Sequence, residues 1–261
     1  MNKMTKKIKL MGIINVTPDS FYEGSRYTTE KIITEKVEQM LNEGADIIDI
    51  GGMSTKPDCD YVTEEEEYKR VIPTVKMLFK KFGNITISLD TFRPNIAKAG
   101  CDEGVKIIND ISGGDDEMYK VAAQYNADYI LMHFVGNDGR MDNTHKYNDI
   151  LQEMVDFFNE KIEKIKSFGV NKIIVDPGFG FSKTVEENNF VLDHVDTFTR
   201  FGYPLLVGIS RKSMIYKPLG ITPSEALPAT LELTKKAIRL GADILRVHDI
   251  KEYIPLISAT N

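Results

Sequence analysis

The stretch ITISLDTFRPNIAKAGCDEGVKIINDI, residues 85–111, contains two short apolar runs separated by a segment long enough for a helix. The first run, 85–89, ends just before Asp90, and the second, 106–111, contains Asn109. Such nearly continuous apolar runs are typical of parallel strands buried on both faces, and neighbouring parallel strands need a crossover connection, usually a helix. The stretch therefore predicts one strand, helix and strand unit of a parallel sheet.

The same alternation of apolar runs and helical segments extends along the whole chain. Eight apolar runs lie at residues 10–16, 45–50, 85–89, 106–111, 129–133, 172–176, 204–209 and 243–248. Eight units in 261 residues allow roughly 33 residues each, which suits a (β/α)8 TIM barrel. We therefore predict a single α/β domain of this class over residues 1–261, with a doubly wound open sheet as the alternative.

Composition excludes several classes of function. Lys and Arg number 33 against 39 Asp and Glu, a net charge of −6, which argues against nucleic-acid binding because phosphate requires a basic surface. The basic start lacks a secretion signal, and no uncharged apolar run approaches the roughly 20 residues that span a membrane. Cys59 and Cys101 are too few for a disulfide framework. We expect a soluble cytoplasmic protein with reduced thiols and no membrane partner.

Polar residues follow nearly every apolar run. In a (β/α)8 barrel the carboxyl ends of the strands carry the chemistry, so these residues are expected to converge at one mouth. They are Asn15, Thr17, Asp90, Asn109, Asp110, His133, Asp176, Ser210, Arg211, Lys212, Arg246 and His248.

Two carboxylates stand out among them. Strand periodicity places Ser88 and Asp90 on one face of their run and the apolar residues on the other, so Asp90 is predicted to point into the mouth. Asp176 ends its run directly before Pro177 and Gly178. Either residue could instead cap the following turn. Two deep carboxylates suit a ligand rich in N–H donors.

Cationic residues cluster after the last two runs. Arg246 and His248 lie two residues apart on a strand, so they share a face and can bind one anion. An ion pair of Arg246 with Asp249 is the structural alternative. Lys212 and Ser213 follow the seventh run, near a predicted helix start, where barrels often bind phosphate. The Asn15 amide offers oxygen to a hard cation or nitrogen to phosphate.

Seven motifs together resemble the dihydropteroate synthase family. They are GIINVTPDSF (12–21), IDIGG (48–52), DT (90–91), INDI (108–111), DPGFGF (176–181), SRKS (210–213) and RVHD (246–249). The resemblance implies a (β/α)8 barrel that condenses 6-hydroxymethyl-7,8-dihydropterin diphosphate with 4-aminobenzoate, giving 7,8-dihydropteroate and diphosphate in folate biosynthesis. It also implies a homodimer.

The resemblance assigns roles to particular residues. Asp90 and Lys212 would be catalytic. The pterin would be bound by Asp90, Asn109, Asp176, Lys212 and Arg246. The diphosphate would be held by Asn15, Thr55, Lys56, Arg246 and His248, with Asn15 also acting through Mg²⁺. The aminobenzoate would lie against Phe21, Pro57, Phe181 and Ser213.

The segment 53–61 departs from the commonest family pattern. Met53 stands where many members have glutamate, Lys56 where arginine is usual, and Asp58 where glycine is usual. Lysine cannot form a bidentate pair with phosphate, so anion binding is expected to be weaker here. These departures leave open a non-catalytic pterin-binding paralogue. A second alternative is a pterin-dependent methyltransferase acting on a corrinoid protein, which resembles this family in its barrel and in its pterin-binding aspartates and asparagine. The methyltransferase would leave the 210–213 motif and the Arg246/His248 pair with little to bind.

Overall fold

One parallel sheet forms the centre of the protein. The computed structural model describes residues 7–16, 26–53, 62–137, 140–142 and 144–258. The strands of the sheet are β1 (Lys9–Asn15), β2 (Ile47–Gly51), β3 (Ile87–Asp90), β4 (Ile107–Asp110), β5 (Asp128–Met132), β8 (Ile173–Asp176), β9 (Leu206–Val207) and β10 (Ile244–Val247). Their order is β8-β5-β4-β3-β2-β1-β10-β9, so chain neighbours are sheet neighbours almost throughout.

The sheet closes into a barrel. Its two outer strands, β8 and β9, are joined by a parallel bridge between Val175 and Leu205, and the Val175 N–H donates to the Pro204 carbonyl at 2.9 Å. Closure confirms the predicted (β/α)8 class and excludes the open-sheet alternative. A short antiparallel hairpin, β6 (Gly136–Asn137) with β7 (Arg140–Met141), follows β5 and was not predicted.

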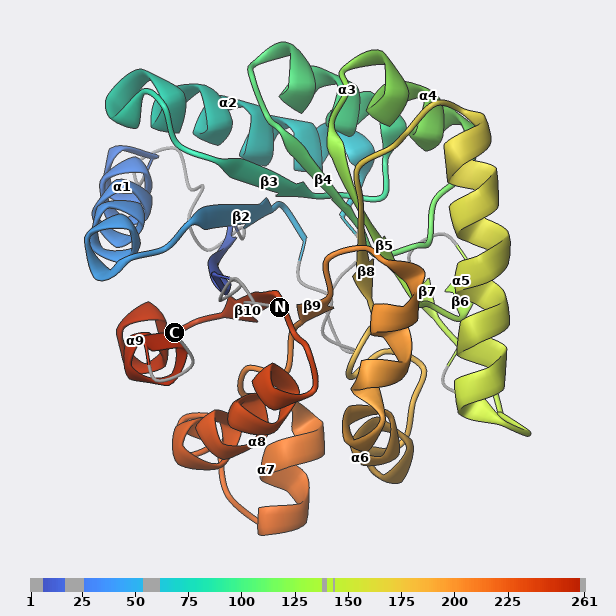
Figure 1. The fold of residues 1–261 in the computed structure, drawn as a ribbon. Coiled ribbons are helices and arrows are strands. Elements are labelled where there is room, and N and C mark those ends of the chain that lie inside the picture. The colour runs from blue at the N-terminus through green and yellow to red at the C-terminus, as the bar shows by residue number, and fades with distance from the viewer. Residues whose placement is uncertain (1–6, 17–25, 54–61, 138–139, 143, 259–261) are drawn as a thin grey trace, which may run out of the picture.

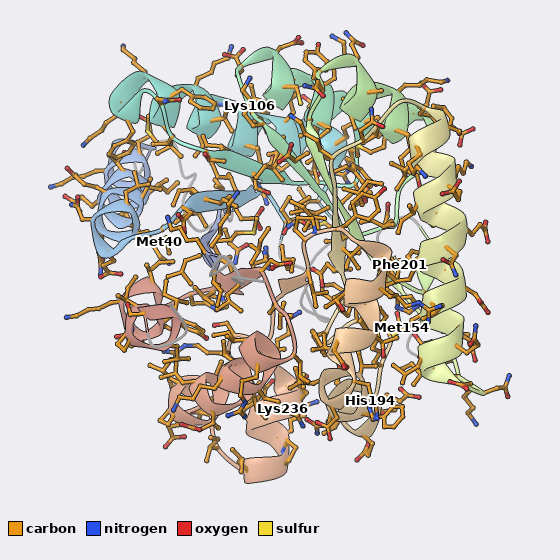
Figure 2. The ribbon with its side chains drawn as sticks, viewed as in Figure 1. Met40, Lys106, Met154, His194, Phe201 and Lys236 are labelled. Carbon is orange, nitrogen blue, oxygen red and sulfur yellow. The ribbon has the colours of Figure 1, made fainter. Side chains whose placement is uncertain are left out.

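Helices surround the strands (Figure 1). They are α1 (Arg26–Glu43), α2 (Glu64–Phe82), α3 (Pro94–Asp102), α4 (Asp116–Gln124), α5 (Ile150–Ser167), α6 (Val185–Asp193), the 3-10 helix η2 (Val195–Phe201), α7 (Ser213–Leu219), α8 (Leu227–Arg239) and α9 (Ile250–Ser258). Figure 2 shows Met154 on the side of α5 that faces the strands, where its side chain is fully buried. None of the described helices is long and apolar enough to cross a membrane.

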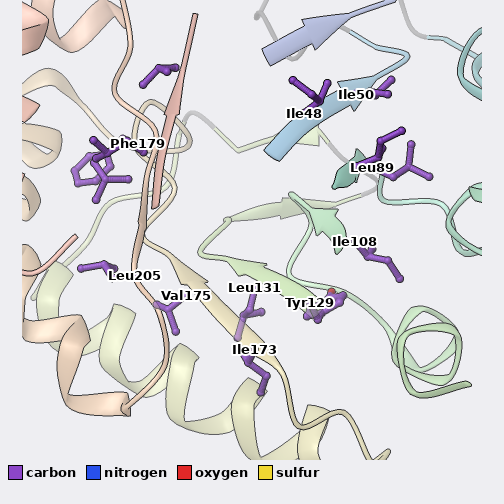
Figure 3. Close-up of a cluster of buried hydrophobic side chains, with 14 of the residues drawn as sticks. Ile48, Ile50, Leu89, Ile108, Tyr129, Leu131, Ile173, Val175, Phe179 and Leu205 are labelled. Atoms are coloured by element: carbon purple, nitrogen blue, oxygen red, sulfur yellow. The ribbon is translucent and has the colours of Figure 1, made fainter. Parts of the chain in front are cut away.

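Two apolar layers stabilise the barrel. The outer faces of the strands pack against the helices, and Figure 3 shows Ile48, Leu89 and Ile108 of this layer on their strands. The inner layer fills the barrel itself with Met11, Ile47, Ile107, Ile130, Ile174, Leu206 and Ile244. Because side chains alternate along a strand, Leu89 in the outer layer places Ser88 and Asp90 on the inner face. The predicted alternation on this strand is confirmed.

Candidate active site

The inner face of the barrel becomes polar at the carboxyl ends of its strands. The residues that face inward there are Asp49 on β2, Asp90 on β3, Asn109 on β4, Asp176 on β8 and Arg246 on β10. Strand register aligns the middle of this set, because Asp90 pairs with Gly51 on one side and Asn109 on the other. Four of the five were predicted site residues.

Arg246 connects the two central carboxylates. Its Nε donates to Asp49 Oδ2 at 2.6 Å, and its Nη2 donates to Asp90 Oδ2 at 2.7 Å. Burial alone would lower the pKa of Arg246, but the neighbouring carboxylates more than offset burial and raise it. The alternative pairing with Asp249 is wrong, because Asp249 binds the Arg211 guanidinium at 2.8 and 2.9 Å.

The Asp90 side chain is 12% exposed, and within the described part of the chain Arg246 is the cation that forms an ion pair with it. Burial is the main cause that raises its pKa, to about 7, while the Arg246 charge opposes the shift and Asp49 adds to it. This carboxylate therefore gains or loses its charge near neutral pH. It is not a turn cap, since its Oδ2 accepts from across the barrel.

Asp49 is the site residue that sequence reasoning missed. It is fully buried, and besides Arg246 it accepts from Asn109 Nδ2 at 3.1 and 3.3 Å. Asp49 lies between two isoleucines in an apolar run, which hides it. It shares one face of its strand with Gly51, and Gly51 pairs with Asp90, so strand alternation could have predicted that Asp49 faces inward. Asp49 orients both the guanidinium and the amide that flank Asp90.

Asn109 presents an unused acceptor to the barrel interior. Its Nδ2 is taken by Asp49, whereas its buried Oδ1 has no hydrogen-bond partner among the described residues. The Ser88 Oγ, on the inner face one layer below Asp90, is likewise buried and unpartnered there. A buried polar atom costs free energy unless it is bonded, so these oxygens favour a bound ligand or water.

Asp176 lies between a turn and a cation. Its Oδ1 accepts from the Gly178 N–H at 2.8 Å, so the alternative prediction that Asp176 caps the following turn is confirmed. Burial raises its pKa, and the Lys212, Arg246 and Lys183 charges oppose that shift. A carboxylate held by one backbone donor and surrounded by cations can still accept N–H groups from a ligand.

Lys212 completes the polar set. Its Nζ donates to the Phe179 carbonyl and lies 4.7 Å from the centre of the Phe181 ring. Burial lowers its pKa to about 8, while Asp176 and Asp90 attract the charged form. Ser213 is the next residue and the first of α7. The structure thus brings Lys212, Phe181 and Asp176 together, as the sequence predicted.

The predicted anion-binding residues are described only in part. Asn15 ends β1 with an exposed side chain, and His248, also exposed, places its ring Nδ1 3.0 Å from Ser210 Oγ. Thr17, Phe21, Thr55, Lys56, Pro57 and Asp58 lie outside the described residues. The described anion-binding candidates are therefore Asn15, Arg246 and His248.

Some strand-end residues were wrongly expected at the mouth. Asp110 points to the outer face, where it accepts from Ser112 Oγ at 2.6 Å and from the Tyr129 hydroxyl at 2.9 Å. Asn109 faces inward, so its neighbour on the same strand must face outward. Arg211 is likewise bound to Asp249 and to two carbonyls, those of Pro223 and Ser224, rather than to the central set.

Comparison with known proteins agrees with this geometry. The family profile described as "Pterin binding enzyme" matches residues 11–248, nearly the whole chain. The chain belongs to the pterin-binding enzyme family. A dihydropteroate synthase of Streptococcus pyogenes serotype M3 is 40% identical to this pterin-binding enzyme over 248 residues, covering 93% of this chain and 90% of the relative.

Solved structures resemble this pterin-binding enzyme over its full length. A Clostridium difficile dihydropteroate synthase, crystallised in the presence of pteroic acid, superposes with a TM-score of 0.90 at 39% identity, covering 100% of this chain and 98% of that one. The Xanthomonas albilineans dihydropteroate synthase with 4-aminobenzoic acid gives 0.89 at 32% identity, with 98% and 92% coverage. This pterin-binding enzyme therefore has the same barrel fold as those synthases.

Proposed function

We propose that this chain is a transferase that condenses 6-hydroxymethyl-7,8-dihydropterin diphosphate with 4-aminobenzoate. The observation that carries the proposal is the convergence of Asp90, Asp176, Lys212 and Arg246, which interact electrostatically with one another at the barrel mouth. Near full-length similarity at about 40% identity to proteins named dihydropteroate synthase supports the same reaction.

The inner acceptors suit the pterin. Its amino and ring N–H groups need acceptors, and Asp176 and the unpartnered Asn109 Oδ1 supply them in a buried setting. Arg246 uses two of the five N–H donors of a guanidinium on the described carboxylates. Its remaining donors can bind the diphosphate, together with His248.

The reaction requires charge stabilisation rather than a covalent intermediate. The bond between the pterin methylene and the diphosphate oxygen breaks, and its electron pair leaves with the diphosphate. The amine nitrogen of 4-aminobenzoate then forms the new C–N bond and releases a proton. The Asp90 carboxylate stabilises the positive charge that develops on the methylene more than it stabilises the ground state, which accelerates the step.

Magnesium fits the described donor set. Mg²⁺ commonly keeps several waters and binds through one or two protein oxygens plus substrate phosphates, so a single exposed amide oxygen on Asn15 is sufficient protein contribution. Bound there with the diphosphate, Mg²⁺ would neutralise the charge of the leaving group. No cluster of three His, Cys, Asp or Glu side chains suited to a metal occurs within the described ranges.

A homodimer in the cytoplasm belongs to the same proposal. Phe190 on α6 and Leu219 on α7 are large apolar side chains exposed on neighbouring helices, 46% and 56% respectively. Exposed apolar surface of this kind supports a protein interface. Within the described residues, Cys101 is a free buried thiol, which agrees with a reducing compartment.

A pyrophosphatase-coupled phosphate-release assay tests the proposed reaction. Purified protein receives the pterin diphosphate, 4-aminobenzoate and Mg²⁺, and each component is omitted in turn. Release that requires both substrates and falls with a chelator supports the synthase. No release, with the pterin still raising the melting temperature, favours the non-catalytic paralogue, and a folate ligand with no use of aminobenzoate favours the methyltransferase.

A further inference from the structure

Lys183 makes a set of contacts that the proposed roles above do not use. It follows the DPGFGF motif directly and precedes α6, whose cap is Thr184. Its Nζ lies 3.0 Å from His133 Nδ1, 3.1 Å from the Gly178 carbonyl and 3.1 Å from the Phe181 carbonyl. One amine thus joins the end of β5 to both ends of the loop that follows β8.

The three partners are all acceptors, which matches an ammonium group. A lysine ammonium has three donors and no acceptor, whereas a neutral amine has only two N–H donors. His133 is buried, and burial, together with the Lys183 charge, holds its pKa well below the usual value, so its ring is neutral. With the proton on Nε2, Nδ1 accepts from Lys183.

The loop held by Lys183 is tightly packed against β5. Gly178 has φ +68°, and a Cβ at that position would lie 2.2 Å from the His133 carbonyl oxygen. The Ser182 Oγ adds a bond to the Val135 carbonyl at 2.6 Å. The loop can therefore approach β5 this closely only with glycine at 178, and Lys183 bonds to that same residue.

The same loop positions two proposed site groups. The Phe179 carbonyl accepts from Lys212 Nζ, and the Phe181 ring lies beneath that amine. Lys183 binds the backbone carbonyl of Phe181, the residue that carries this ring. Loss of the Lys183 bonds would release the Phe181 ring and, through it, the surroundings of Lys212.

We propose that Lys183 is a positioning residue, which fixes residues 178–181 so that the Phe181 ring is held on the 4-aminobenzoate side of the active site, against Lys212 of the pterin site. The expected effect on the KM for 4-aminobenzoate rests on the proposed function, whereas the expected effect on the position of the loop does not. Among the described residues, the hydrogen bonds of Lys183 go to His133 and to two loop carbonyls rather than to a proposed substrate-binding side chain, so its positioning effect is transmitted through the loop, beside the direct effect of its charge on Asp176 and Lys212.

The protonation state of Lys183 is set close to the working range. Burial lowers its pKa to about 7; Asp176 and Glu187 favour the charged form, and Lys212 opposes it. His133, the group in direct contact, stays neutral. Above this pKa the amine loses one donor and offers a lone pair to one of three acceptors. The loop is therefore expected to loosen as the pH rises through 7.

A fluorescent reporter tests the positioning without any turnover. The chain has no tryptophan, so Phe181→Trp introduces a single tryptophan on the loop itself, which is excited selectively to separate its signal from that of the 11 tyrosines. Its steady-state anisotropy is titrated from pH 6 to 9 in F181W, F181W/K183R and F181W/K183M. We expect a fall centred near pH 7 in F181W, no such step in F181W/K183R, and low anisotropy at every pH in F181W/K183M. Identical titrations in the three proteins would overturn the proposal.

Kinetics in the otherwise unchanged chain test the catalytic consequence. Lys183→Met should raise KM for 4-aminobenzoate on the order of tenfold, because misplacing a binding group without removing it weakens complementarity. Lys183→Arg should recover most of that loss, and Lys172→Met, which removes a lysine 55% exposed and salt-bridged to Asp128, serves as the matched control with unchanged KM. An unchanged KM in K183M contradicts the inference.

The two proposals fail in distinguishable ways. If the parent protein does not condense the substrates, the proposed function fails, while the anisotropy titration still decides the role of Lys183. If K183M does not fold, the comparison of F181W with F181W/K183R decides alone: a step near pH 7 that persists in the arginine variant overturns the role of Lys183.

Discussion

Asp49→Asn removes a charge from the centre of the barrel mouth with almost no change in shape. Asp49 is fully buried and accepts from Arg246 Nε at 2.6 Å and from Asn109 Nδ2 at 3.1 Å. Both donors reach the same oxygen, Oδ2, so the asparagine oxygen can still accept from both. The bond to Arg246 is then no longer charge-assisted, and a charge-assisted bond contributes about 1.5–3 kcal/mol to the free energy of unfolding.

The expected change in melting temperature follows from that free energy. For chains of this length class each kcal/mol lowers the melting temperature by roughly 2–4 °C, so Asp49→Asn should lower it by about 3–12 °C. Thermal unfolding followed by circular dichroism measures the shift. The mutant should also hold Arg246 closer to Asp90, and removal of the Asp49 charge should lower the pKa of Asp90.

Asp116→Asn is the matched control. Asp116 accepts from Lys164 at the same distance, 2.6 Å, but its side chain is 55% exposed. Exposed pairs contribute about 0–1 kcal/mol because water screens them and both side chains lose entropy. The control should therefore shift the melting temperature much less. Equal shifts in the two variants would refute the argument that burial decides the value of the Asp49 contacts.

Three further predictions concern Asp90 and a buried ion pair. Asp90→Asn should fold normally but lose turnover on the order of 100-fold, the scale of a missing electrostatic stabiliser; near-normal kcat would rule out its role. Because burial raises the pKa of Asp90 to about 7, its charge is lost as pH falls, and kcat/KM should fall about tenfold per pH unit below 7. A flat profile between pH 5.5 and 7 would contradict this. Arg93→Met removes the ion-pair partner of the buried Glu67 carboxylate. It should lower the free energy of unfolding by about 3–5 kcal/mol and the melting temperature by roughly 6–20 °C. Lys98→Met, an exposed change on the helix α3 that begins directly after Arg93, should shift it by less than about 2 °C, and an equally small shift for Arg93→Met would show that the buried pair stabilises little.

The barrel could be predicted because its strands are buried on both faces. That condition makes each strand a nearly continuous apolar run, and each of the eight runs overlaps a strand of the barrel. Strand ends were less predictable. The run 204–209 contains only the two-residue strand β9, since hydrogen bonding, not apolarity, sets where a strand begins and ends.

The candidate site was predicted where a polar side chain ends an apolar run. Asp90, Asp176 and Arg246 have that signature and lie at the mouth. Asp110 has it too but faces outward, because adjacent residues on one strand cannot share a face. Asp49 lacks it, since isoleucines flank it.

Lys183 shows a second limit of sequence reasoning. Its place before a helix cap suggests an ordinary helix start, and α6 does begin there with a Thr184 and Glu187 capping box. One of the three contacts on which its proposed role rests is with His133, fifty residues earlier in the chain. Only the tertiary structure brings such groups together.

The proposed reaction forms a C–N bond between a pterin methylene and an aromatic amine. Mass spectrometry with ¹⁵N-labelled 4-aminobenzoate and the pterin diphosphate detects that bond in the product. We expect labelled 7,8-dihydropteroate from the parent protein and on the order of 100-fold less from Asp90→Asn. Folded parent protein that binds the pterin but yields no labelled product would contradict it.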